Sequence, residues 1–294
     1  MREFYCKRKG LFVCLFIVLS FVMLFNTTVK AEDEPVKPSE STEDKPAANV
    51  YVDILSQYMW RGFALSQASA VIQPSLTASY KGFSLNVWGN LDSNAKFQNN
   101  PSVGTKWDET DLTFSYTREI YGGLSGTVGC IYYAYALNSV FAGADVPDSF
   151  EVYGGLSYTF PWFTLAVTGY REVSHYPGWT IQFDVSRNLK LPWYDMSVDL
   201  GMTYFYLNSK DSTVYPGTFN TQGQPVDDNV AFSGMLSGQL AAALNIPLGK
   251  YFTITPKIGF AFPLSGNATN LIRYSSWDGV QNHIYGGLRI SAAF

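Results

Sequence analysis

Small or polar side chains, some of them charged, recur at every second position within segments whose intervening residues are apolar. Asp53 is flanked by Val52 and Ile54, and Arg289 also lies between two apolar neighbours. A period of two places the charges on one face of a β-strand and the apolar side chains on the other. Carboxylates on an enclosed face favour cations, whereas basic side chains favour anions. The chemistry predicted for these residues is therefore the selection of solutes by charge.

Twelve segments of about ten residues position these charges, each alternating between apolar and polar side chains. They span residues 49–60, 70–80, 83–93, 108–119, 123–136, 149–159, 162–171, 178–188, 194–207, 229–245, 251–263 and 283–294. Strands of this length suit a membrane span, and backbone groups in hydrocarbon need protein partners, so the strands must close on themselves. The sequence predicts an all-β fold, a 12-stranded antiparallel transmembrane β-barrel of the outer-membrane type, over residues 49–294.

The connections between these segments alternate between tight and long. The tight ones lie at 81–82, 121–122, 161, 191–193 and 247–250, and aromatic residues flank them. The longest connections are 208–228 and 264–282. This alternation predicts that all tight turns lie at the periplasmic rim, with an aromatic girdle, and that both termini are periplasmic. The barrel-assembly machinery is then an expected partner of the C-terminal strand, which ends at Phe294.

A secreted β-sandwich is the soluble alternative, because its strands also alternate. Sandwich strands are about half as long as these segments. Aromatic residues make up 16% of the chain and charged residues only 15%, whereas soluble domains have about 25% charged residues. Both features favour the barrel over the sandwich.

The N-terminal residues predict export. A basic start, an apolar run over 11–25 and a small-residue cleavage site at Ala31 define a signal peptide at 1–31. The run is too short for a retained membrane anchor, which is the alternative. Residues 32–48 are acidic and contain proline, which predicts a disordered periplasmic lead-in. Once the signal is cleaved, Cys130 is the one cysteine left, so an intrachain disulfide is excluded. The expected location is the bacterial outer membrane.

Three segments carry a family resemblance: SQYMWRG at 56–62, GFSLNVWGNLD at 82–92 and EVYGGLSY at 151–158. Their order resembles the TorF family of porins, also called Gcw_chp, in which an S-x-Y-x-x-R-G segment precedes a strand with a G-x-W pattern. The resemblance covers the N-terminal half, and the long loops at 208–228 and 264–282 depart from the family pattern. It implies an outer-membrane channel without an established substrate.

Two acids are candidates for a constriction inside the barrel. If the connection between Arg187 and Tyr194 is a symmetric turn, Asp184 and Asp199 lie directly opposite each other. Facing carboxylates repel unless a cation is near. They form either a cation-preferring constriction or, with Lys257, part of an ion-paired plug, and the sequence leaves both open.

Other candidates lie at the barrel seam and at the pore mouth. Asp53 and Arg289 should meet where the first and last strands close the barrel, as a buried ion pair rather than a ligand site. Arg61 is expected at the mouth, where it either meets an anionic solute or bonds Glu109 or Asp92. Trp60, beside it, is expected in the outer aromatic girdle.

The function predicted is a narrow channel for small polar or cationic solutes, with membrane lipid and lipopolysaccharide as neighbours. A closed structural or adhesive barrel that displays its loops is the alternative. A lipid hydrolase is a third hypothesis, but neither His175 nor His283 has a recognisable nucleophile beside it, so we expect no enzyme activity. No spacing of ligands predicts a metal or cofactor. Removal of the predicted signal peptide, with five basic residues and one acidic residue, changes the net charge from −4 to −8, which argues against nucleic acid as a partner.

Overall fold

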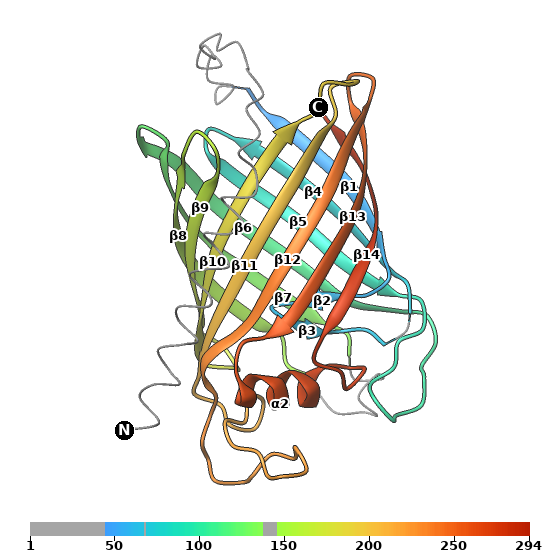
Figure 1. Cartoon of the computed structure of the whole chain (residues 1–294), viewed down its shortest axis with the longest axis vertical. Helices are drawn as coiled ribbons and strands as arrows, with labels where there is room; N and C mark the ends of the chain where they lie inside the picture. The colour runs from blue at the N-terminus through green and yellow to red at the C-terminus, as the bar shows by residue number, and fades with distance from the viewer. Residues whose placement is uncertain (1–44, 68, 138–145) are drawn as a thin grey trace. The chain divides into compact units, whose positions relative to one another are not determined.

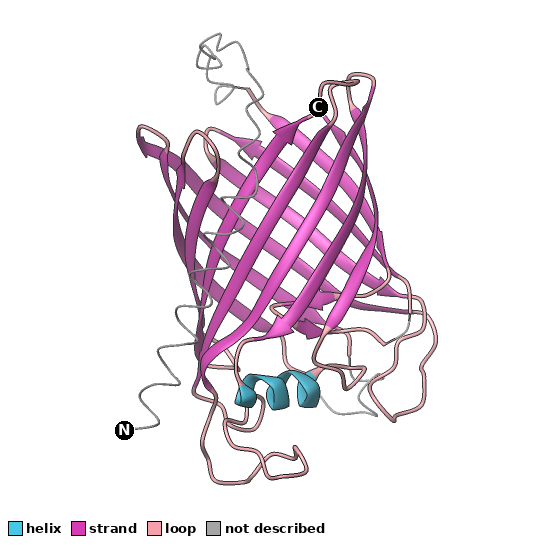
Figure 2. Ribbon diagram, viewed as in Figure 1, coloured by secondary structure: helices cyan, strands magenta, loops and turns pink. Residues whose placement is uncertain are grey.

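The computed structural model describes residues 45–67, 69–137 and 146–294. The predicted signal peptide (1–31) and residues 32–44 of the predicted lead-in lie outside the described residues. Within the described ranges, twelve strands form a closed antiparallel barrel with one short helix at its long-loop end (Figures 1 and 2). The predicted fold class is confirmed.

The order of the barrel strands follows the sequence, apart from a small hairpin inserted after the first. The barrel strands are β1 (Ala47–Leu55), β4 (Val71–Tyr80), β5 (Phe83–Asp92), β6 (Lys106–Tyr121), β7 (Leu124–Tyr135), β8 (Ser149–Thr159), β9 (Thr164–Glu172), β10 (Gly178–Lys190), β11 (Ser197–Ser209), β12 (Ser233–Leu248), β13 (Phe252–Pro263) and β14 (His283–Ala293). The inserted hairpin consists of β2 (Met59–Trp60) and β3 (Phe63–Ala64), and the helix is α2 (Gly266–Ser275).

Most strand boundaries lie within three residues of the prediction, and two differ by more: the end of β1 and the start of β12. The first strand begins at Ala47, so it includes the last two residues of the predicted lead-in. It ends at Leu55 instead of residue 60. Strand β13 matches its predicted range closely. Strand β12 starts at Ser233, four residues after its predicted start. Helix α2 was not predicted. The alternation of side chains locates strands well but says little about where a strand ends and a loop turns inward.

The barrel closes through β1, which pairs with β14 on one side and with β4 on the other. Ala48 and Phe294 exchange backbone hydrogen bonds of 3.1 and 2.9 Å, so the C-terminal residue lies beside the start of β1. The tight turns lie at this same end of the barrel, and the long loops and α2 lie at the other (Figure 1). The predicted separation of tight turns from long loops is confirmed.

The outer surface of the barrel is a band of exposed aliphatic side chains. Leu85, Leu112 and Val128, on three neighbouring strands, are 52%, 45% and 60% exposed. Aromatic residues such as Trp162 and Tyr194 are exposed at the tight-turn end, where an interfacial girdle was expected. A closed barrel with such a band satisfies its backbone internally and presents apolar groups to lipid. Among the described residues, no helix has the length and hydropathy needed to span a membrane.

Candidate functional site

The segment after β1 turns into the barrel instead of continuing along the wall. Trp60 pairs with Phe63, so Arg61 and Gly62 form a two-residue turn between β2 and β3. Both turn residues have positive φ, 50° and 96°, as in a type I′ turn. A Cβ on Gly62 would lie 2.4 Å from the side chain of Ser237, so only glycine permits this approach to the wall. We call residues 59–64 the lumen hairpin. It is the structural form of the family-like SQYMWRG segment.

The tip of the lumen hairpin reaches the opposite wall of the barrel. Arg61 donates two parallel hydrogen bonds to Glu151 on β8, of 2.7 and 2.6 Å, and one of 3.2 Å to Thr180 on β10. Ser237 on β12 donates to the Arg61 carbonyl oxygen at 2.8 Å. The hairpin leaves from β1 and returns to β4, and the strand order places β8 to β12 across the barrel from these two. The hairpin therefore crosses the lumen.

The Arg61–Glu151 pair is buried and enclosed by aromatic rings. The two side chains are 9% and 6% exposed. The guanidinium lies 4.5 Å from the Trp60 ring and 4.6 Å from the Tyr170 ring, distances at which cation–π attraction contributes. Tyr133 donates a hydrogen bond of 2.9 Å to Glu151. The expectation that Arg61 bonds Glu109 or Asp92 is wrong, because the inward turn carries Arg61 across the lumen. Trp60 faces the lumen too, so its predicted place in the outer girdle is also wrong.

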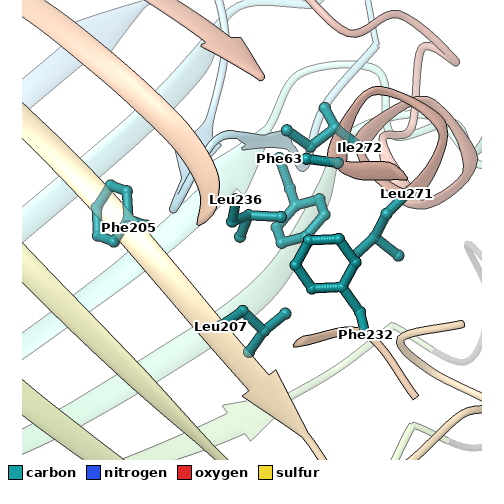
Figure 3. Close-up of a cluster of buried hydrophobic side chains, with 8 residues drawn as sticks. Phe63, Phe205, Leu207, Phe232, Leu236, Leu271 and Ile272 are labelled. Carbon is teal, nitrogen blue, oxygen red and sulfur yellow. The ribbon is translucent and has the colours of Figure 1, made fainter. Parts of the chain in front are cut away.

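A hydrophobic cluster occupies the long-loop end of the barrel (Figure 3). It consists of Phe63, Phe205, Leu207, Phe232, Leu236, Ala268, Leu271 and Ile272. Helix α2 contributes residues spaced three and four apart, which share one helix face. Ser265 caps its first turn by accepting from the Ala268 N–H at 3.1 Å. The Ala64 N–H donates to the Ser276 hydroxyl at 3.1 Å, and the Trp277 N–H donates to the Ala64 carbonyl oxygen at 2.8 Å, which ties β3 to the end of α2. The cluster thus joins the lumen hairpin to the helix.

The predicted seam pair is present. Asp53 and Arg289 face each other in the β1–β14 register. Arg289 Nε and Nη2 donate to the Asp53 carboxylate at 2.9 and 2.8 Å. Lys257 on β13 donates to the same carboxylate at 2.8 Å. The expectation that Lys257 pairs with Asp184 or Asp199 is therefore wrong.

Replacing Asp53 with alanine is expected to weaken barrel closure. The carboxylate is only 5% exposed and balances two cations, which would be left unpaired beside each other. Breaking a buried pair costs about 3–5 kcal/mol, and the partial exposure of both cations places the effect at the lower limit. The temperature at which the unboiled protein loses its fast-migrating gel form should fall. Asp199→Ala removes a lumen acid without an ion pair and is the control; an equal fall for both variants would contradict the assignment.

The two candidate constriction acids do not face each other. Asp184 pairs with Thr203, and Asp199 pairs with Asn188. The turn between β10 and β11 spans 191–196, further along the chain than the predicted turn at 187–194. As a result, Asp184 faces a residue four positions beyond Asp199. Hydrogen bonds from Thr203 at 2.7 Å and from Asn188 at 2.6 Å satisfy the two acids separately. The predicted facing pair is wrong.

The acids predicted at the pore mouth lie at the inner face of β5 and β6. Asp92 is fully buried and accepts from the Asn94 N–H at 2.9 Å, and Glu109 accepts from the Tyr58 hydroxyl at 2.9 Å. A bulge in β6 buries Asp108 as well, which sequence reasoning missed. A signal for it exists. Trp107 and Leu112 are both apolar and both face outward. They are five positions apart, and on a regular strand an odd spacing would place them on opposite faces, so a bulge must lie between them.

Two cavities lie along the lumen. The first has a volume of about 500 Å³ and is bounded by the lumen hairpin, the long loops and the nearby strand ends. The second, of about 440 Å³, lies towards the tight turns, and Asp199, Lys257 and Arg289 are among its lining residues. The first cavity is within the range of small-molecule sites. Both open onto polar groups, so the lumen between the wall and the hairpin can hold water and small solutes.

Both histidines contact neighbouring hydrogen-bond acceptors. His175 Nδ1 lies 2.8 Å from the Asp148 carbonyl oxygen, which can only accept, so Nδ1 carries the proton and cannot take one from Ser174. His283 pairs with Asp278 at 3.0 Å. Burial raises the pKa of Asp278, but hydrogen bonds from His283, Val280 and Gln57 outweigh it and hold that pKa below its ordinary value. This contact anchors the start of the inward segment through Gln57.

Comparison with known proteins gives a family match over part of the chain. The sequence model of a family described as bacterial proteins of unknown function (Gcw_chp) matches residues 42–168, which is less than half of the chain. The match includes the lumen hairpin and Glu151. The Gcw_chp part of the resemblance is confirmed over these residues, whereas the label TorF stays a prediction. A sequence search of curated proteins gives no match.

A comparison with solved structures gives matches at low sequence identity. The NanC porin is 10% identical, with a TM-score of 0.48 over 84% of this chain and 98% of that chain. The KdgM porin is 8% identical, with a TM-score of 0.45 and the same coverage. An outer membrane channel from Pseudomonas putida F1 is 9% identical, with a TM-score of 0.48 over 91% of this chain and all of that one.

Proposed function

We propose that this chain is an outer-membrane channel for small polar or cationic solutes, narrowed by the lumen hairpin. The observation that carries the proposal is a closed barrel with an apolar outer band and a polar lumen that contains cavities. Membrane lipid and lipopolysaccharide would contact the outer band. The C-terminal strand ending at Phe294, which is 68% exposed, would be the segment offered to the barrel-assembly machinery.

Acidic side chains outnumber basic ones in the lumen, which supports a preference for cations. Arg61, Lys257 and Arg289 are each engaged by Glu151 or Asp53. The acids Asp92, Asp108, Glu109, Asp184 and Asp199 have hydrogen-bond donors but no ion pair within the part of the chain that the structure describes. A lumen with this excess of carboxylates favours cations over anions.

A closed barrel that displays its loops is the second candidate, and the hydrophobic cluster favours it. Phe63, Phe232 and Leu271 pack together at the long-loop end, where a solute would enter. Such a cluster excludes water as long as the helix and the hairpin stay in place. The channel proposal therefore requires that this packing loosens while the barrel stays closed.

Planar bilayer recordings of the full chain under a potassium chloride gradient distinguish the two candidates. We expect single-channel steps of small conductance, with a reversal potential towards that of potassium, because the lumen carries excess carboxylates. Boiled protein, which has lost the barrel, is the control. A membrane that stays silent with folded protein would favour the closed barrel, and a reversal potential towards chloride would contradict the cation preference.

A further inference from the structure

The cavity beside the lumen hairpin has an unbalanced set of charges. Its described lining includes four carboxylates and a single basic residue, Arg61. The carboxylates are Asp108, Glu109, Glu151 and Glu172. All four are at most 6% exposed. Burying charge without a compensating group is costly, so the partner of each carboxylate decides what the cavity can accept.

Two of the four carboxylates are satisfied by the protein itself. Glu151 forms the bidentate pair with Arg61, which uses the cavity's one described cation. Glu172 accepts from the backbone N–H groups of residues 174, 175 and 176 at 2.9, 3.0 and 2.7 Å, and from the Ser149 hydroxyl at 3.1 Å. It shapes the loop after β9. Neither carboxylate is available to a ligand.

Asp108 and Glu109 are not satisfied in this way. Asp108 Oδ1 accepts from Asn90 at 2.7 Å, but its Oδ2 is buried without a hydrogen-bond partner. Glu109 accepts from the Tyr58 hydroxyl at 2.9 Å, and its other described side-chain contact is a hydrogen bond with the neighbouring acid Asp111. Neither residue forms an ion pair with another described residue. The β6 bulge places them side by side at the cavity wall, and no basic side chain among the described residues pairs with either of them.

The rest of the lining indicates what kind of cation fits. Aromatic rings dominate it, among them Trp60, Tyr133, Tyr135 and Trp277. Ring faces attract ammonium groups that carry organic substituents, and carboxylates pair with them. Within the described ranges, no group of three or more acidic, histidine or cysteine side chains could hold a metal ion. An organic cation matches this combination better than a metal.

We propose that the cavity binds an organic ammonium compound, with Asp108 and Glu109 as its counter-ions and the aromatic rings around its substituents. This inference deepens the proposed function, because it names the solute class that the lumen would select. The cation would enter from the long-loop side, where residues such as Tyr176 and Tyr274 border the cavity. Its charge would replace the missing partner of Asp108 Oδ2.

Choline and its uncharged isostere 3,3-dimethylbutan-1-ol are suitable probes, titrated calorimetrically into the full-length barrel in detergent. We expect choline to bind and the isostere not to bind. The double variant Asp108→Asn, Glu109→Gln keeps the size and the acceptors of both side chains, and should weaken choline binding at least about tenfold. Asp199→Asn removes a charge from the other cavity and should leave binding unchanged. The fast-migrating gel form of the unboiled protein shows that each variant is folded.

The outcomes separate this inference from the channel proposal. Equal binding of choline and the isostere, equal binding by wild type and the double variant, or no binding of choline would each overturn it. Choline binding by a barrel that conducts no current would support the inference and contradict the channel. Conductance without choline binding would support the channel and contradict the inference.

Discussion

Replacing residues 56–70 with the two-residue turn Asn-Gly is expected to raise the single-channel conductance several-fold. Leu55 and Val71 are a directly paired residue couple of β1 and β4, so a two-residue hairpin turn can join them without altering the register of either strand. The change removes the lumen hairpin and its bond to Glu151 across the barrel. It leaves all twelve barrel strands intact, so the apolar band and the closure persist.

The control for this deletion is the exposed tip of another loop. The tip at 220–224 is closed by backbone bonds between Asn220 and residues 223 and 224, and lies in the longest loop. Shortening it should leave the conductance near that of the wild type. Bilayer recordings at one salt concentration measure both variants, and the gel shift on boiling reports folding. A hairpin deletion that folds yet conducts like the wild type would show that the hairpin does not limit the pore.

The second large effect is expected from Arg61→Met, which should release the lumen hairpin without removing it. The substitution leaves Glu151 buried, and among the described residues only the Tyr133 hydroxyl still donates a hydrogen bond to it. Leaving one member of a buried ion pair uncompensated costs about 3–5 kcal/mol, and 3 kcal/mol corresponds to about a hundredfold in the docking equilibrium. The open probability in bilayers should rise accordingly. Arg61→Lys should lie between, because lysine cannot form the bidentate pair.

A double-mutant cycle separates the ion pair from simple loss of packing. Arg61→Met with Glu151→Met removes both charges, and its open probability should lie closer to wild type than that of Arg61→Met alone. Arg273→Met is the matched control, since Arg273 lies on α2 and bonds Gln281 at the surface. If Arg61→Met behaved like Arg273→Met, the pair would have no part in holding the hairpin.

The acidic pair Asp108–Glu109 and the ion pair Arg61–Glu151 border the same cavity but have different roles in these proposals. One pair holds the hairpin by a bond within the protein, and the other is left for a solute. The effects of the two sets of variants should therefore be measured separately, by conductance for Arg61 and by binding for Asp108 and Glu109.

The barrel is predicted from the alternation of side chains and the lengths of the connections. Twelve long alternating segments joined by turns of alternating length can satisfy their backbone groups in hydrocarbon by closing into a barrel. The same pattern correctly predicts that Asp53 lies opposite Arg289 where the first and last strands pair. Alternation predicts which face of the strand each residue lies on, but not which residue of the neighbouring strand lies opposite. The predicted pairing of Asp184 with Asp199 was wrong because alternation does not locate the centre of the turn between their strands. Regular alternation also does not predict a bulge, so the buried position of Asp108 in β6 was not predicted.

Only the tertiary structure decided what occupies the lumen. SQYMWRG has the pattern of a strand, and nothing local shows that the chain turns inward at Ser56. The turn is fixed by distant partners: Glu151 for the Arg61 side chain, Ser237 against Gly62, and residues 276–277 beside β3. Contacts between segments separated by 90 to 221 positions depend on the closed wall that surrounds them. Local periodicity carries no information about such contacts.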